Sequence, residues 1–209
     1  RVAFFYDDAN NASITERKLL EEHQDEIGYE LVAVESSPEG RTDVSGPVSK
    51  IAAANPDVIF ISHLVPESAA FMKQIRARGV DAPFVGGHPF ATLKIFEVAG
   101  KAGEGSLTFV PYLGDTGDPA TKEFIDAYKA KYGSEPDQFA ALGYDAATAL
   151  LRAVEEAGSD DPKAIRDALA QLKGVDGIAA NISYEGGPEN TTPELVLVRV
   201  EGGKFVPAE

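Results

Sequence analysis

Residues 42–90 read TDVSGPVSKIAAANPDVIFISHLVPESAAFMKQIRARGVDAPFVGGHPF, and this stretch decides the fold. It contains two short runs of β-branched and aromatic residues, Val58 to Ile61 and Phe84 to Val85. A turn signal rich in Pro and Asp precedes each run, and a loop that opens a helical pattern follows it. Strands buried on both faces of a parallel sheet show such continuous apolar runs. The stretch therefore predicts two helix and strand pairs of a parallel sheet, joined by right-handed crossovers.

The same alternation continues on both sides of this stretch. Before it, strands are expected at residues 2–6 and 29–34, separated by a helix over 14–27 that Gly28 ends. After it, a helix is expected at 91–99 and a strand at 106–110. Five strands alternating with four helices predict an open doubly wound α/β unit.

The first helix carries a local start signal. Ser13-Ile14-Thr15-Glu16 fits a capping box, in which the Ser side chain accepts a backbone N–H and the Glu reaches back. We therefore expect Ser13 to be the N-cap of this helix.

At Pro111 the pattern changes. Residues 119–173 contain three helical patterns, each with Pro near its start and Gly near its end, and no strand signal. The remainder of the chain resembles two or three strands joined by Gly-rich turns. We expect a domain boundary within PYLGDTGDP, residues 111–119, and a second near residues 186–193.

Composition excludes several classes of function. The 209 residues include 34 acidic and 19 basic side chains, a formal charge of −15, which repels nucleic acid and anionic membranes. No Cys is present, so disulfides, thiolate metal sites and Cys nucleophiles are excluded. The three His residues lack the spacing of metal ligands. We expect neither a metal nor a cofactor, and no nucleic-acid partner.

Catalytic and nucleotide-binding motifs are missing from the sequence. No G-x-G-x-x-G follows a strand, and there is neither a Walker motif nor a G-x-S-x-G elbow. A small α/β enzyme remains a distant alternative, with Asp8 and His88 as its only acid–base candidates.

Several stretches, taken in order, resemble one family. They are VAFFYDD, TDVSGPVSKIAAANPDVIFIS, KQIRARGVDAPFVGG, FIDAYKAKYGSEPDQFAALGYDAATALLRAVEEAGS and ELVLVRVEGGKF. Together they resemble the type I periplasmic binding proteins, in particular the branched-chain amino-acid and amide-type substrate-binding proteins of ABC importers. The resemblance implies two α/β lobes with a ligand cleft between them. Residues 1–111 and 193–209 then correspond to the second lobe, and residues 112–192 to a partial first lobe with three helices and a short strand.

The resemblance also implies a setting for the protein. We expect a non-enzymatic solute-binding protein, periplasmic or extracellular, which delivers its ligand to an ABC transporter permease. A lipid anchor in the full-length protein stays an open alternative, as does a ligand-sensing domain of a receptor or regulator with the same fold. The chain opens inside its first strand, so we expect that a signal peptide or other upstream segment was removed. The helices of residues 119–173 would lack the sheet they normally cover, which predicts self-association through exposed apolar faces.

Ligands of open α/β sheets bind beyond the carboxyl ends of the strands. The candidate ligand-binding residues lie in the loops that follow the strands and are Asn10, Asn11, His63, Leu64, His88, Phe90 and Tyr112. A structural role at a turn is the open alternative for the Asn residues.

The resemblance makes His88 the most informative of these residues. In amino-acid-binding relatives the matching position commonly carries a carboxylate that receives the ligand's ammonium group, and Asn11 and Leu64 stand where tyrosines are common. An imidazole at residue 88 favours a ligand with a carboxylate or another acceptor. We expect a small polar organic ligand, an amino acid, amide or carboxylate, captured by hinge closure.

Overall fold

A computed structural model describes residues 1–87, 90–114, 117–184 and 195–208 of the chain. The chain forms two compact units, which we call unit 1 (Arg1–Val110 and Leu197–Glu209) and unit 2 (Pro111–Val196).

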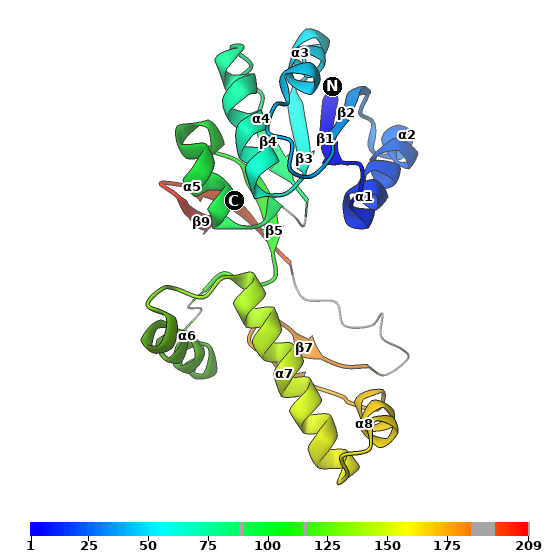
Figure 1. Cartoon of the computed structure of the whole chain (residues 1–209), viewed down its shortest axis with the longest axis vertical. Helices are drawn as coiled ribbons and strands as arrows, with labels where there is room; N and C mark the ends of the chain where they lie inside the picture. The colour runs from blue at the N-terminus through cyan, green and yellow to red at the C-terminus, as the bar shows by residue number, and fades with distance from the viewer. Residues whose placement is uncertain (88–89, 115–116, 185–194, 209) are drawn as a thin grey trace. The chain divides into compact units, whose positions relative to one another are not determined.

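Unit 1 is built on a seven-stranded sheet with the order β2-β1-β3-β4-β5-β8-β9 (Figure 1). Its strands are β1 (Val2–Asp7), β2 (Leu31–Ser37), β3 (Val58–Ser62), β4 (Phe84–Gly86), β5 (Leu107–Val110), β8 (Val196–Glu201) and β9 (Lys204–Pro207). The first five pair in parallel, while β8 and β9 pair antiparallel. The predicted doubly wound parallel sheet is confirmed.

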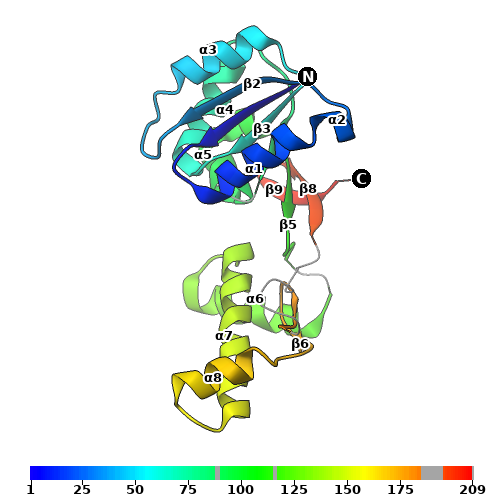
Figure 2. The ribbon, with the colours of Figure 1, turned by 90° about the vertical axis from the view of Figure 1, so that its right-hand side faces the viewer.

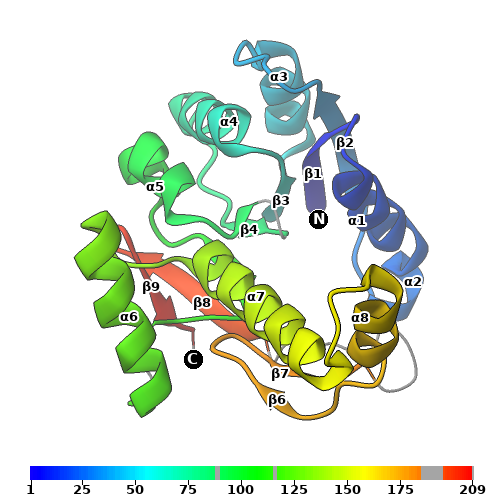
Figure 3. The ribbon, with the colours of Figure 1, turned by 60° about the horizontal axis from the view of Figure 1, so that its bottom comes forward.

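Helices cover both faces of this sheet. They are α1 (Asn11–Glu22), α2 (Gln24–Ile27), α3 (Ser45–Ala54), α4 (Val65–Ala77) and α5 (Leu93–Ala99), followed by the 3-10 helix η2 (Gly100–Gly103). Figures 2 and 3 show α3, α4 and α5 on one face and α1 with α2 on the other. Strands covered on both faces lose contact with water on both sides, which explains their continuous apolar runs.

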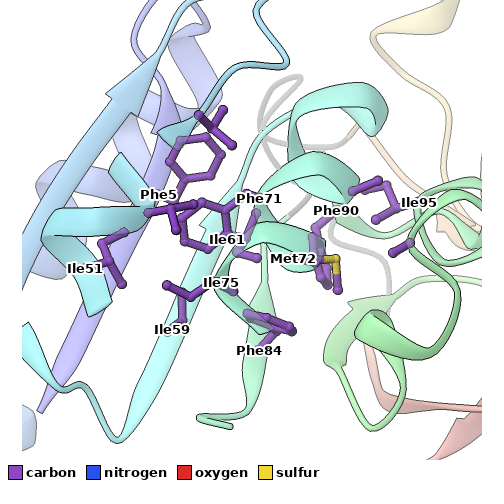
Figure 4. Packing of buried hydrophobic residues seen from close by; sticks show 14 of the residues in the cluster. Phe5, Ile51, Ile59, Ile61, Phe71, Met72, Ile75, Phe84, Phe90 and Ile95 are labelled. Atoms are coloured by element: carbon purple, nitrogen blue, oxygen red, sulfur yellow. The ribbon is translucent and has the colours of Figure 1, made fainter. Parts of the chain in front are cut away.

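The core of unit 1 lies between the sheet and the layer of α3, α4 and α5 (Figure 4). The rings of Phe5 on β1 and Phe71 on α4 stack with their centroids 4.3 Å apart. Burial of each large apolar side chain contributes roughly 1.5–3 kcal/mol. The fully buried members include Phe5, Ile51, Ile59, Ile61, Phe71, Met72, Ile75, Phe84, Phe90 and Ile95.

The predicted capping box at Ser13 is wrong. Asn10 is the N-cap of α1, and its side-chain oxygen accepts hydrogen bonds from the backbone N–H of Ala12 at 2.9 Å and of Ser13 at 3.3 Å. Asn caps helices as well as Ser does, so the helix begins three residues earlier. Ser13 is instead fully buried and accepts a hydrogen bond from the Ser62 hydroxyl at 2.9 Å. The carboxylate of Glu16 is therefore not used for capping.

The expected single helix over residues 14–27 is two helices. His23 ends α1, and α2 continues to Ile27, where Gly28 adopts the left-handed conformation with φ of +84° and ends the segment as predicted.

The described residues of unit 2 form three helices and a short strand pair. They are α6 (Pro119–Tyr132), α7 (Gln138–Ala157), α8 (Pro162–Leu169), β6 (Val175–Asp176) and β7 (Asn181–Ile182). The second half of α7 packs against α8 and β7, as Figure 3 shows, through a cluster that includes Ala149, Ala153, Leu172 and Ile182. The first half packs with α6 through Phe124, Ile125 and Ala141.

One buried carboxylate fixes the loop beside α7. Asp145 is 4% exposed, and its two oxygens accept hydrogen bonds from the backbone N–H of Ile178, Ala179 and Ala180 at 2.6, 2.8 and 3.2 Å. Hydrogen bonds to a carboxylate are stronger than those between neutral groups. The carboxylate also gives each of these three N–H groups a partner.

Another part of the α7 surface is apolar. Phe139, Tyr144, Leu150 and Leu151 are all about half exposed or more in the described chain. Self-association through such helix faces stays a prediction.

We predict that Asp145→Asn loosens the 178–180 loop. The amide offers one acceptor oxygen in place of two, so at least one N–H loses its partner, at a cost of about 1–3 kcal/mol. Hydrogen exchange at Ile178, Ala179 and Ala180 should become faster. Asp160→Asn, at an exposed position, is the matched control and should leave these rates unchanged. Equal protection in both variants would contradict the assigned role.

We predict that Gly86→Ala destabilises unit 1. A Cβ at Gly86 would lie 1.7 Å from Cδ1 of the fully buried Phe90, so the aromatic ring would have to move within a packed core. Such overpacking costs about 1–3 kcal/mol. Gly46→Ala on α3 is the control, since apart from neighbouring backbone of its own helix no atom of the described residues lies within 4 Å of its Cβ position. Urea denaturation should show a lower midpoint for Gly86→Ala and an unchanged or higher midpoint for Gly46→Ala.

Candidate ligand-binding edge of unit 1

The carboxyl ends of β1, β2, β3 and β4 meet at one edge of the unit 1 sheet, because these strands run in parallel. The residues that follow the strands therefore share this edge. We call it the carboxyl edge.

Both acidic residues at the end of β1 stabilise the turn. Asp7 is buried and accepts a hydrogen bond from the backbone N–H of Ala9 at 2.9 Å. Asp8 accepts one from the Ser36 hydroxyl, on the neighbouring β2, at 2.8 Å. Asn10 caps α1, as described above, whereas Asn11 is exposed at the first residue of that helix. Ligand contact by Asn10 and Asn11 stays a prediction.

His63 lies beneath the carboxyl edge and is fully buried. The backbone N–H of Leu64 donates to its Nδ1 at 2.9 Å, so the proton is assigned to Nε2. This nitrogen faces the carbonyl oxygen of Ser37 at 2.9 Å and its hydroxyl at 3.1 Å. The imidazole also stacks on Phe5, with ring centroids 5.3 Å apart. In this arrangement both ring nitrogens are hydrogen-bonded within the protein, and ligand contact by His63 stays a prediction.

Glu67 completes this buried cluster and had no signal in the sequence beyond an acidic residue in a first helical turn. It is 1% exposed, and its Oε1 accepts a hydrogen bond from the backbone N–H of Gly40 at 2.7 Å. Its Oε2 lies 3.5 Å from Nδ1 of His63 and has no hydrogen-bond partner among the described residues. The cluster of Ser37, His63 and Glu67 thus ties the loop after β2 to the start of α4.

The remaining candidate residues, apart from His88, are buried or half-buried. Leu64 is half-buried at the N-cap of α4. Phe90 is fully buried and packs edge-on against Phe96, with ring centroids 5.2 Å apart. Tyr112 belongs to unit 2, where it is buried. His88 lies outside the described residues, so its role stays a prediction. The structure thus brings Asn10, Asn11, His63 and Leu64 to the carboxyl edge.

The carboxylate of Glu16, which the sequence predicts to be part of a capping box, also lies at this edge. A Cβ placed on Gly87 would lie 2.1 Å from Oε2 and 2.4 Å from Oε1 of Glu16. The Glu16 carboxylate therefore lies directly against the backbone of the residue that follows β4. Its neighbour Arg17 is engaged elsewhere: hydrogen bonds to Tyr6 and Glu21 raise the pKa of its guanidinium.

Neither a metal centre nor a membrane span is found in the described part of the chain. Among the residues that the structure describes, no group of three or more His, Asp or Glu side chains could hold a metal ion. None of the helices in the same residues is both long enough and apolar enough to cross a membrane.

We predict that Glu67→Gln and Glu67→Ala have different effects. The amide keeps an oxygen for the N–H of Gly40, so Gln should stay within about 1 kcal/mol of the parent protein. Ala removes that acceptor and leaves a cavity, and should cost about 2–4 kcal/mol. Denaturation midpoints of the two variants, compared with the exposed control Glu22→Ala on α1, measure the difference. Equal losses for Gln and Ala would show that the charge itself is needed.

Comparison with known proteins gives the family. A family profile described as periplasmic binding protein matches residues 1–204. A Leu/Ile/Val-binding protein homolog from Brucella suis is 30% identical over 195 residues, which are 92% of this chain and 50% of that protein. A leucine-, isoleucine-, valine-, threonine- and alanine-binding protein from Pseudomonas aeruginosa is 30% identical over 145 residues, 69% of this chain and 39% of its own length. The chain spans about half the length of the curated relatives it matches.

Solved structures agree with this assignment. A leucine-binding protein from Thermotoga maritima superposes with a TM-score of 0.87 at 29% identity, covering 100% of this chain and 59% of that one. A branched-chain amino acid transporter substrate-binding protein from Streptococcus pneumoniae, in complex with isoleucine, gives 0.87 at 27% identity and covers 98% of this chain and 57% of its own. These matches confirm the resemblance found in the sequence, and the chain belongs to the periplasmic binding protein family, with the type I fold.

Proposed function

We propose that this chain is part of a substrate-binding protein of an ABC importer and that its ligand is a small amino acid or a closely related polar molecule. The carboxyl edge of unit 1 carries the proposal, because ligands of open α/β sheets bind at such edges. Further support comes from the relatives, which are named as binding proteins for branched-chain amino acids, one of them solved with isoleucine.

In this proposal unit 1 corresponds to the second lobe of the family, residues 1–111 with 193–209, and residues 112–192 to part of the first lobe. The ligand is held between the two lobes of the longer protein, and its higher affinity for the closed form drives hinge closure. A permease then reads the closed form outside the cytoplasmic membrane. The relatives are binding proteins, so no catalytic role is assigned to Asp8 or His88.

If each lobe provides about half of the ligand contacts, a single lobe binds the ligand much more weakly than the whole protein. A micromolar ligand binds with about −8 kcal/mol, and half of that corresponds to a dissociation constant near 1 mM. The 209-residue chain should therefore bind its ligand only in the millimolar range.

Thermal unfolding of a version extended to the full length of its relatives tests the proposal. We expect one or more of leucine, isoleucine, valine, threonine and alanine to raise its Tm, since a ligand at a hundred times its dissociation constant stabilises by about 2.7 kcal/mol. Glucose is the control and should have no effect. Titration calorimetry on the 209-residue chain should detect no micromolar binding. The absence of any shift would contradict the ligand class, and micromolar binding by the 209-residue chain would contradict the two-lobe mechanism.

A further inference from the structure

Glu67 is a buried carboxyl group whose two oxygens are in different situations. It lies in the first turn of α4 and is 1% exposed. Its Oε1 accepts the backbone N–H of Gly40 at 2.7 Å, whereas no hydrogen-bond donor among the described residues reaches its Oε2. An ionised oxygen in this position is costly, because burial without a donor penalises the charged form.

The neighbour of this oxygen is an acceptor as well. Oε2 lies 3.5 Å from Nδ1 of His63, which is fully buried. Nδ1 accepts the backbone N–H of Leu64 at 2.9 Å, and Nε2 faces the carbonyl oxygen of Ser37 at 2.9 Å, so the ring proton belongs on Nε2. An ionised Glu67 would therefore hold two acceptor atoms against each other in the core with no proton between them.

Other charged groups on the surrounding elements do not relieve this contact. Among the described residues, the ion pairs within 4.0 Å that involve Glu67 or His63 are limited to the contact between these two side chains. Glu35 pairs with Lys50 instead, and Asp7 accepts the N–H of Ala9. The remaining charged groups on these elements near the carboxyl edge are Asp8 at the end of β1, the exposed Glu39, Arg41 and Asp43 in the loop after β2, and the exposed Lys73 on α4.

We propose that the pair of Glu67 and His63 keeps one proton at neutral pH and acts as a pH-sensitive latch on the loop after β2. The proton is placed on Oε2 of Glu67, which then becomes a donor that faces Nδ1. The neutral carboxyl group still accepts the N–H of Gly40 through Oε1, so the loop stays attached to α4. When the pH rises and the proton leaves to water, the ionised carboxylate leaves the core and Gly40 loses its partner.

Proton linkage gives the direction of the pH dependence. Above about pH 6.5 the unfolded chain holds no proton on either side chain, whereas the folded pair holds one. Unfolding then releases a proton, so the stability that the pair contributes is present below this pH and is lost as the pH rises above it.

Glu67→Gln imitates the protonated acid, since its amide keeps a donor and an acceptor but does not titrate. Below about pH 6.5 the unfolded His63 takes up a proton, which destabilises this variant but not the parent chain. The ratio of the unfolding equilibrium constant of the parent to that of Glu67→Gln should therefore rise about tenfold per pH unit from about pH 5 to pH 8. Urea denaturation measures it. Glu22→Gln, at an exposed position of α1, is the matched control, and its ratio to the parent should not change with pH.

NMR of the 209-residue chain tests the proton directly and needs no variant to fold. At about pH 6.5, where an exposed Glu is ionised, we expect the carboxyl ¹³C resonance of Glu22 at the position of a carboxylate and that of Glu67 at the position of a protonated acid. The hydrogen-exchange protection factor of Gly40 should fall above the pH at which the Glu67 resonance changes. In Glu67→Gln it should stay constant.

Three results would overturn the proposal. A Glu67 resonance that titrates together with that of Glu22 would mean that the acid is ionised at neutral pH. A constant ratio of the two unfolding constants from pH 5 to pH 8 would mean that the folded pair holds no additional proton. Unchanged protection of Gly40 after Glu67 has ionised would mean that the proton does not control the loop.

Discussion

The parallel pairing of β1 with β3 is the constraint on which unit 1 depends. Five residue pairs, from Val2 with Val58 to Tyr6 with Ser62, hold the two strands in register. β1 also pairs with β2 on its other side, so its backbone groups are satisfied while its side chains are buried on both faces. Because the register is fixed, the ends of these strands come level with each other. The carboxyl edge is a direct result of this alignment.

Several polar groups at this edge form hydrogen bonds that link neighbouring elements. The contacts of Ser13 with Ser62 and of His63 with Ser37 are buried, that of Glu67 with Gly40 is part-buried, and all three link neighbouring elements. Buried polar groups need such partners, and once paired they make the edge rigid. A rigid support of this kind holds the loop residues above it in fixed positions.

Unit 2 is held together mainly by helix packing, not by a large sheet. Its longest helix, α7, packs with α6, α8 and β7 through small residues such as Ala141, Ala149 and Ala153, and the buried charge of Asp145 fixes the neighbouring loop. Large apolar side chains, Leu150 and Leu151 among them, face away from these contacts. Helices with apolar residues around most of their circumference are typically packed on more than one side.

The sequence by itself determined the strands, the helices and the parallel sheet, because apolar runs, Pro and Gly act locally, and it determined the family through matches along nearly the whole chain. It also located the carboxyl edge. The tertiary structure decided between Asn10 and Ser13 as N-cap, since both residue types cap equally well: the Asn10 side chain accepts the first N–H groups of α1, while Ser13 is buried against Ser62. It also placed His63 in the core and Glu16 against Gly87. Burial and contacts between distant segments depend on how elements pack, and no local pattern records them.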